Sequence, residues 1–198
     1  MYFVVGALIA APIGACSSDE VDSDEQARRA YLGLDKSVDR SIQLGFDGFN
    51  SAQSANIMTQ TGAGSAGGTI AINGQVDQGS SANKGMRLTI GMTAYSDSPI
   101  SVGDNKTVTL VYDTNTDVAT QPKLDLQLKG IPTGTVDGTL AGVYHMTGDI
   151  KGDVTLTLTI TGALQDAGGG KVARKPGTTH ITGTAVSGAG TFHVDVMI

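Results

Sequence analysis

The chain is poor in the residues that mark several specialised protein classes. Its 198 residues include 1 Cys and 0 Trp, and aromatic residues make up only 5%. A single thiol excludes an internal disulfide framework. Lys and Arg number 13 against 19 Asp and Glu, giving a net charge of −6. Without a basic stripe, this charge argues against DNA or RNA as a partner.

Glutamate is almost missing as well, because Glu20 and Glu25 are the only two in the chain. The other acids are aspartates, and there are 28 Gly. Asp, Gly and Thr favour turns and strands, whereas Glu favours helices. The composition therefore favours one mainly β domain, long enough to bury a real core.

Residues 1–15 form an apolar run that ends in small residues, which is the outline of a secretory signal. Ile13, Gly14 and Ala15 then precede Cys16, and this segment resembles the lipobox of bacterial lipoproteins. About 14 apolar residues span roughly 21 Å of helix, too short for a hydrocarbon core of about 30 Å. An ordinary cleaved signal and a short membrane helix are the alternatives.

The lipobox resemblance implies that Cys16 is acylated and becomes the mature N-terminus, with residues 16–22 as a tether to the membrane. Two or more acyl chains, at roughly 0.8 kcal/mol per buried methylene, anchor a protein stably. In lipoproteins of Gram-negative bacteria, a residue such as Ser17 after the cysteine typically permits transfer to the outer membrane. The expected location is therefore the bacterial cell envelope, on an outer membrane and facing the periplasm or the surface.

A long amphipathic helix is predicted over residues 23–60. Ser23 and Gln26 match a capping box, which satisfies free N–H groups at a helix start. Gly45 and Gly48 predict a bend, or first turns that stand off as a stalk. We expect the apolar stripe to pack on a sheet, with a coiled coil as the alternative. The stripe consists of Leu34, Val38, Ile42, Phe46 and Phe49.

After a Gly-rich linker at 61–68, the hydrophobic period changes to two, which predicts an antiparallel β region over 69–198 that forms one domain with the helix. The joints are short and rich in turn residues, so they suit hairpins and a meander rather than crossover helices. About eight strands are expected. They lie around 70–76, 86–92, 108–112, 124–128, 140–146, 154–160, 180–186 and 191–198.

Glycines inside the expected strands predict a strongly curved sheet or a barrel, because glycine allows curvature and close backbone approach. They include Gly74, Gly91, Gly142 and Gly183. One helix with a single apolar stripe can cover the concave side of such a sheet. In architecture alone, this arrangement resembles the half-barrel carriers of bacterial lipoprotein transport, and a shared architecture does not confer function.

Motifs for catalysis fail on their context. The Gly62–Gly67 segment has the spacing of a dinucleotide-binding loop but follows a helix and precedes a strand, which is the reverse of the required order. Ser81 and Lys84 have the spacing of a serine acyl-enzyme motif but lie in an expected loop without supporting motifs. We therefore expect no enzymatic activity and no cofactor, with an uncharacterised hydrolase as the minor alternative.

A loop and a hairpin contain the candidate metal ligands of the chain. Asp113, Asn115 and Asp117 place oxygen ligands at alternate positions and are a weak calcium candidate, since the rest of a helix-loop-helix calcium loop is missing. Turn-forming side chains are the alternative there. In the last hairpin, if Val186 pairs with Thr191, His193 faces Thr184 and His180 faces Met197. The two histidines then lie too far apart along the strands to bind one metal ion.

A concave apolar face offers a different kind of site. Met86, Met92, Tyr144 and Met146 are expected to point inward, and flexible thioethers beside glycines can accommodate an acyl chain. Core filling under the helix is the alternative. The leading prediction is a lipid-anchored envelope protein with a non-enzymatic structural or interaction role, whose partner is another envelope protein or a lipid. The second prediction is a carrier of lipid or another apolar ligand.

Overall fold

The computed structural model describes residues 24–103 and 106–198. The predicted signal peptide, the lipobox of Ile13, Gly14 and Ala15, Cys16 and the tether at 16–22 all lie outside the described residues.

One helix is followed by a succession of strands. The elements are α1 (Asp24–Ser51), β1 (Gln60–Ala63), β2 (Gly67–Val76), β3 (Lys84–Ser96), β4 (Ile100–Gly103), β5 (Lys106–Val108), β6 (Leu110–Asp113), β7 (Lys123–Lys129), β8 (Thr135–Gly148), β9 (Gly152–Gly168), β10 (Lys171–Arg174), β11 (His180–Ser187) and β12 (Gly190–Met197).

Ten of these strands form one antiparallel sheet, in the order β1-β2-β3-β6-β8-β9-β11-β12, with β7 also pairing with β3 and β8, and β10 pairing with β9. The short strands β4 and β5 form a separate hairpin. The prediction of a mainly β antiparallel fold with one helix is confirmed. The expected number of eight strands is wrong, because β1, β4, β5 and β10 have only 3 or 4 residues each and are too short to show alternation.

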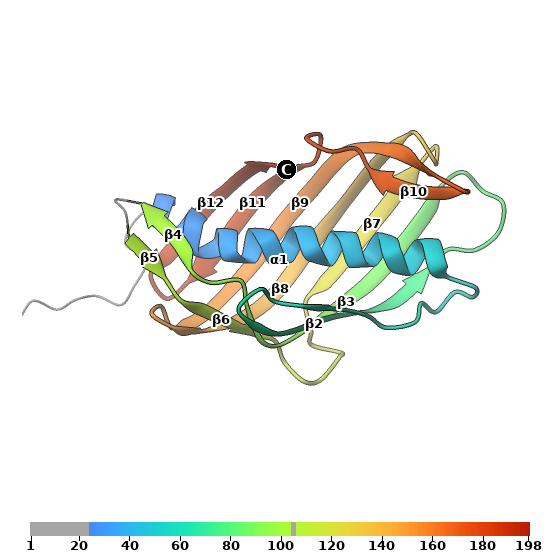
Figure 1. The fold of residues 1–198 in the computed structure, drawn as a ribbon. Coiled ribbons are helices and arrows are strands. Elements are labelled where there is room, and N and C mark those ends of the chain that lie inside the picture. Colours follow the sequence, from blue (N-terminus) through green and yellow to red (C-terminus); the bar gives the residue numbers. More distant parts are fainter. Residues whose placement is uncertain (1–23, 104–105) are drawn as a thin grey trace, which may run out of the picture.

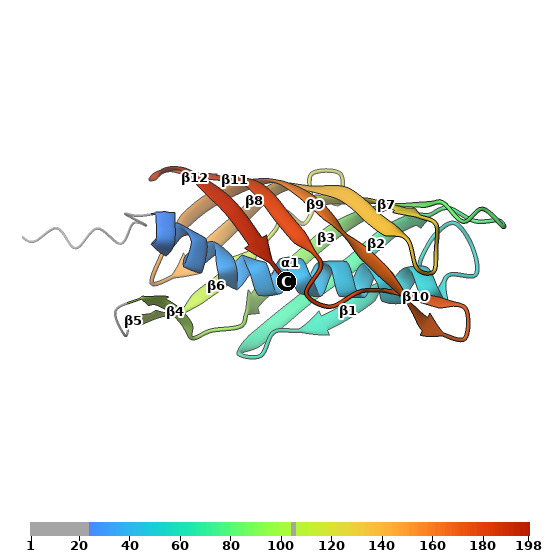
Figure 2. The ribbon, with the colours of Figure 1, turned by 90° about the horizontal axis from the view of Figure 1, so that it is seen from above.

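The sheet curves around α1, which lies along its concave side (Figures 1 and 2). Two glycines inside strands show why the backbones can approach so closely. A Cβ atom on Gly74 would lie 2.2 Å from the carbonyl oxygen of Arg87, and one on Gly183 would lie 2.1 Å from that of Thr157. Both glycines also have positive φ angles, 138° and 147°, which side chains disfavour. The strand order begins at β1 and ends at β12, so the described sheet has two edges.

The helix runs without interruption through Gly45 and Gly48, so neither glycine breaks it. Gly45 faces β3 and Gly48 faces the segment that leads into β1, and both allow close packing there instead of breaking the helix. A Cβ atom on Gly45 would lie 2.8 Å from Cδ1 of Leu88, and one on Gly48 would lie 2.8 Å from Cδ1 of Ile57.

The helix ends at Ser51, which corrects its predicted end at residue 60. The next residues form an isolated bridge between Asn56 and Gln75 and then lead into β1. The predicted linker at 61–68 is corrected too, because it contains most of β1 and the first residues of β2. Its glycines permit the tight hairpin that joins these strands, since a Cβ atom on Gly64 would lie 2.4 Å from two carbonyl oxygens.

The core is continuous from the helix to the sheet. Val38, Ile42 and Phe46 of the predicted apolar stripe are buried, as is Leu44 beside them, and Phe49 packs against the same core. Over residues 36–51, most positions of the helix are buried or half-buried. Within this range, the exposed positions are Lys36, Gln43, Asp47 and Ser51.

Candidate functional site

The predicted apolar lining lies in the core, under the helix. Met86 and Met92 lie on β3, Tyr144 and Met146 on β8, and all four side chains are at most 3% exposed. They belong to the same continuous core as Ile42 of α1. None of them lines either of the two surface cavities described below.

Tyr144 differs from the other three in carrying a polar atom into this core. Its hydroxyl is buried and has no hydrogen-bond partner. Burial raises the pKa of this phenol well above its ordinary value of 10.0, so the group stays neutral. An unpaired hydroxyl in an apolar interior costs free energy, because it has lost water without gaining a partner.

The three residues of the predicted calcium loop accept hydrogen bonds from backbone N–H groups. Asp113 accepts a hydrogen bond from the backbone N–H of Ala94 at 2.8 Å. Asn115 accepts one from Asp117 at 2.9 Å, and Asp117 accepts one from Ala119 at 3.0 Å. Asn115 and Asp117 thus bond to a backbone N–H two residues further on, as turn-forming side chains do, whereas the Asp113 bond crosses to β3.

The predicted hairpin register is confirmed, since Val186 pairs with Thr191 and His193 lies opposite Thr184. Two other histidine side chains pair with aspartates on the exposed surface. His180 contacts Asp195 at 2.7 Å, and His145 contacts Asp153 at 2.6 Å. Within the part of the chain that the structure describes, no group of three His, Cys, Asp or Glu residues is placed to hold a metal ion.

A groove that sequence reasoning missed lies between α1 and β10. It has a volume of about 440 Å³, and Phe46 and Val172 contribute apolar surface to it. Its polar residues are Asp39, Gln43, Asp47, Asn50, Lys171 and Arg174. A second cavity of about 270 Å³ shares Asp39 and Arg174 with it and extends to the segment between β10 and β11.

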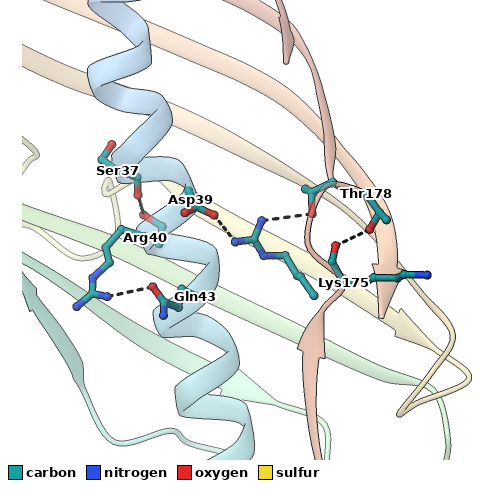
Figure 3. A network of polar contacts seen from close by, with 9 residues as sticks. Ser37, Asp39, Arg40, Gln43, Lys175 and Thr178 are labelled. Atoms are coloured by element: carbon teal, nitrogen blue, oxygen red, sulfur yellow. Dashed lines mark hydrogen bonds and ion pairs between the residues drawn. The ribbon is translucent and has the colours of Figure 1, made fainter. Parts of the chain in front are cut away.

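The helix is held to this side of the molecule by an ion pair and by an amide. Arg174 donates hydrogen bonds to the carboxylate of Asp39 and to the hydroxyl of Thr179, and its side chain is only 16% exposed (Figure 3). Asn50 donates to the carbonyl oxygen of Val172 at 2.8 Å and accepts from the N–H of the same residue at 2.9 Å. The Asn50 amide thus satisfies the outer edge of β10 as a neighbouring strand would. We call these two contacts the α1–β10 latch.

The residues of the groove suit ligand binding or structural contacts between α1 and β10. It combines two carboxylates, two cations and two amides over an apolar floor, and its lining contains no Cys, His or Ser that could act as a nucleophile. Because Asp39 and Arg174 already neutralise each other, the groove does not present a strong charge of one sign.

On the opposite side of the helix, a carboxylate ties the β1–β2 hairpin to the end of β3. Asp97 accepts hydrogen bonds from the N–H of Ser65 at 2.7 Å and from the hydroxyl of Tyr95 at 2.6 Å. Partial burial raises the pKa of this carboxyl, but the hydrogen bonds from Ser65 and Tyr95, together with the charge of Lys36, outweigh burial and hold the pKa below its ordinary value of 3.8. The pKa of Tyr95 is raised, by burial first and by its bond to Asp97 second.

Comparison with family models, with curated proteins and with solved structures gives no match. Among the described residues, the helix is not long and apolar enough to cross a membrane.

Proposed function

We propose that this chain is a lipid-anchored protein of the bacterial cell envelope with a non-enzymatic structural or interaction role. The observation that carries the proposal is the occupied concave side of the sheet. A sheet of this curvature offers an apolar trough, and here the trough is filled by side chains of α1 such as Ile42 and Phe46. A protein whose trough is filled by its own helix interacts through its outer face, its edges and its anchor.

The anchor is supported by the sequence Ile13-Gly14-Ala15-Cys16, with Ser17 after the cysteine. The described domain begins with α1 only a short distance further along the chain, so an acylated Cys16 would hold the domain close to the membrane surface. The outer membrane, facing the periplasm or the surface, is the proposed location.

The anchor is tested with Cys16→Ser. Cells expressing the wild-type chain are labelled with an alkyne fatty acid and fractionated. We expect the wild type to be labelled and membrane-bound, and the variant to be unlabelled and released, because it lacks the acyl acceptor. Ser17→Ala is the matched control and keeps both label and membrane association. Unchanged membrane association of Cys16→Ser would refute the anchor.

A second function, carriage of a lipid or another apolar ligand, is favoured by the unpaired hydroxyl of Tyr144. A ligand whose polar head accepts a hydrogen bond would satisfy this group, with Met86, Met92 and Met146 packed around an acyl chain. Entry would require α1 to move away from the sheet, which breaks the α1–β10 latch.

The carrier function is tested by native mass spectrometry on protein purified from cells under gentle conditions. Co-purified lipid in the wild type that is lost in Tyr144→Phe supports it, since only the hydroxyl is removed. Wild-type protein free of lipid, before and after incubation with phospholipid vesicles, contradicts it.

A further inference from the structure

The edge strand β12 carries an interaction surface that goes beyond the proposed function. β12 pairs with β11 along one side over its whole length, from Gly190 to Met197, without a bulge. Among the described residues, no strand pairs with its other side. The opposite edge of the sheet is the short strand β1, with only 4 residues.

The alternation of backbone hydrogen bonds between β11 and β12 determines which backbone groups of β12 point outward, toward a possible partner strand. Thr179 and Ile198 exchange both of their backbone hydrogen bonds, at 3.1 and 2.9 Å. Pairs that exchange such bonds alternate along an antiparallel ladder. The even-numbered residues of β12 therefore bond to β11, and the odd-numbered ones direct their N–H and C=O groups outward. These residues are Thr191, His193, Asp195 and Met197.

β12 carries few of the features that protect an edge strand, and Asp195 is its one acidic side chain. Natural edge strands are usually blunted by lysine, proline, a bulge or short length. β12 is 8 residues long and has none of the first three. On its concave face, Val194 and Val196 are only half-buried, and on the other face Met197 is 58% exposed. A neighbouring strand would satisfy the backbone groups and cover this apolar surface.

We propose that β12 pairs antiparallel with β12 of a second copy of this chain, about a two-fold axis at Val194. This register places Val194 opposite Val194 of the second copy and uses all of the outward-facing residues. Thr191 lies opposite Met197 of the second copy, and His193 lies opposite Asp195. The two sheets then continue into one another through about eight backbone hydrogen bonds, two for each directly bonded pair.

Charge complementarity selects this register over its neighbours. A shift of the axis to position 193 places His193 opposite itself, and a shift to 195 places two aspartates opposite each other. Like charges directly opposite each other across two strands are unfavourable, whereas opposite charges are favourable. Only the axis at Val194 gives an acid opposite a histidine at both symmetry-related positions.

The pairing of single strands is a small interface, so we expect a dimer that depends on protein concentration. The test uses the full-length chain with Cys16→Ser, so that an introduced cysteine is the only thiol and membrane anchoring plays no part. Residue 194 forms a non-hydrogen-bonded pair with its symmetry mate, with Cα atoms about 4.5 Å apart, which suits a disulfide.

Val194→Cys is oxidised with copper phenanthroline and analysed on non-reducing gels. Val196→Cys is the matched control, since it lies on the same face and is also half-buried, but its symmetry mate lies about 13 Å away along the strand. We expect a disulfide-linked dimer with Val194→Cys and at least tenfold less with Val196→Cys. Equal cross-linking of both cysteines, or none with Val194→Cys, would overturn the proposal.

Two further variants test the hydrogen bonds and the charges by sedimentation velocity over a concentration series. His193→Pro removes an outward N–H but no bond to β11, so we expect at least tenfold weaker association with an unchanged circular dichroism spectrum. His193→Asp should weaken association as well, and the swap of His193→Asp with Asp195→His should restore it. A wild-type chain that remains monomeric up to millimolar concentration refutes the dimer.

Discussion

Two buried tyrosines differ in one respect that decides what their hydroxyl groups contribute to stability. Tyr95 donates a hydrogen bond to Asp97 at 2.6 Å, whereas the hydroxyl of Tyr144 is buried without a partner. A buried polar group without a partner costs roughly 1–3 kcal/mol, while a typical hydrogen bond contributes about 1 kcal/mol.

Tyr144→Phe is therefore expected to raise the free energy of unfolding by about 1 kcal/mol, because it removes a polar atom and leaves the ring in place. Tyr95→Phe is the matched substitution with the opposite sign, and it should lower this free energy by about 1 kcal/mol. Urea unfolding followed by circular dichroism measures both. A clear loss of stability in Tyr144→Phe would show that its hydroxyl is satisfied.

Asp97 gives a prediction about pH. Its pKa in the folded protein is lower than in the unfolded chain, so the unfolded state binds a proton more readily. Its ionised form therefore contributes stability above the ordinary pKa of 3.8, and this contribution is lost as the pH falls below that value. At pH 6, we expect the unfolding free energy of the wild type to be higher than that of Asp97→Asn. The two values should converge toward pH 3. A difference that is constant over this range would contradict the assignment.

Among the elements, α1 and β10 meet through contacts that join residues far apart in the sequence. Asn50 bonds to both backbone groups of Val172, across 122 residues, and β10 has only 4 residues with which to hold itself to β9. This short strand depends on the helix because one of its edges would otherwise be left unpaired.

Asn50→Ala should lower the free energy of unfolding by about 1–3 kcal/mol, because the N–H and C=O of Val172 lose their partner. Amide exchange at Val172 should rise more than exchange in the centre of β9, as β10 loosens locally. Gln43→Ala is the control on the same helix, since Gln43 is exposed and its side chain accepts a hydrogen bond from Arg40 of the same helix. Equal effects of the two substitutions would argue against a latch at Asn50.

How much of this architecture was predictable depends on the range of the interactions. The strands β2, β3, β6, β7, β8, β9, β11 and β12 were predicted because each buries one face, as the alternation of Leu124, Leu126 and Leu128 illustrates. The glycines of α1 were misread as breakers, because their function lies in contacts with Leu88 and Ile57 that only the folded chain creates. The α1–β10 latch could not be predicted for the same reason, since Asp39 and Arg174 are 135 positions apart and neither stands in a motif.

For the whole molecule, the two proposed functions differ in whether α1 is a permanent part of the core or a cover that opens. Ile42 has no exposed surface and belongs to the same continuous core as Leu140 and Ile160 of the sheet. A helix buried in this way should unfold together with the strands, as one cooperative unit.

Hydrogen exchange measured by mass spectrometry separates these cases. For a permanent core helix, we expect residues 38–49 to open with the same free energy as β8 and β9. Ile42→Ala should lower both by about 2–5 kcal/mol, the usual cost of truncating a buried aliphatic side chain. In a carrier, α1 would open at a lower free energy than the sheet, and Ile42→Ala would reduce the protection of the helix while leaving β8 and β9 nearly unchanged. Separate opening of α1 would therefore favour the carrier, since a trough that empties without unfolding the sheet can admit an acyl chain.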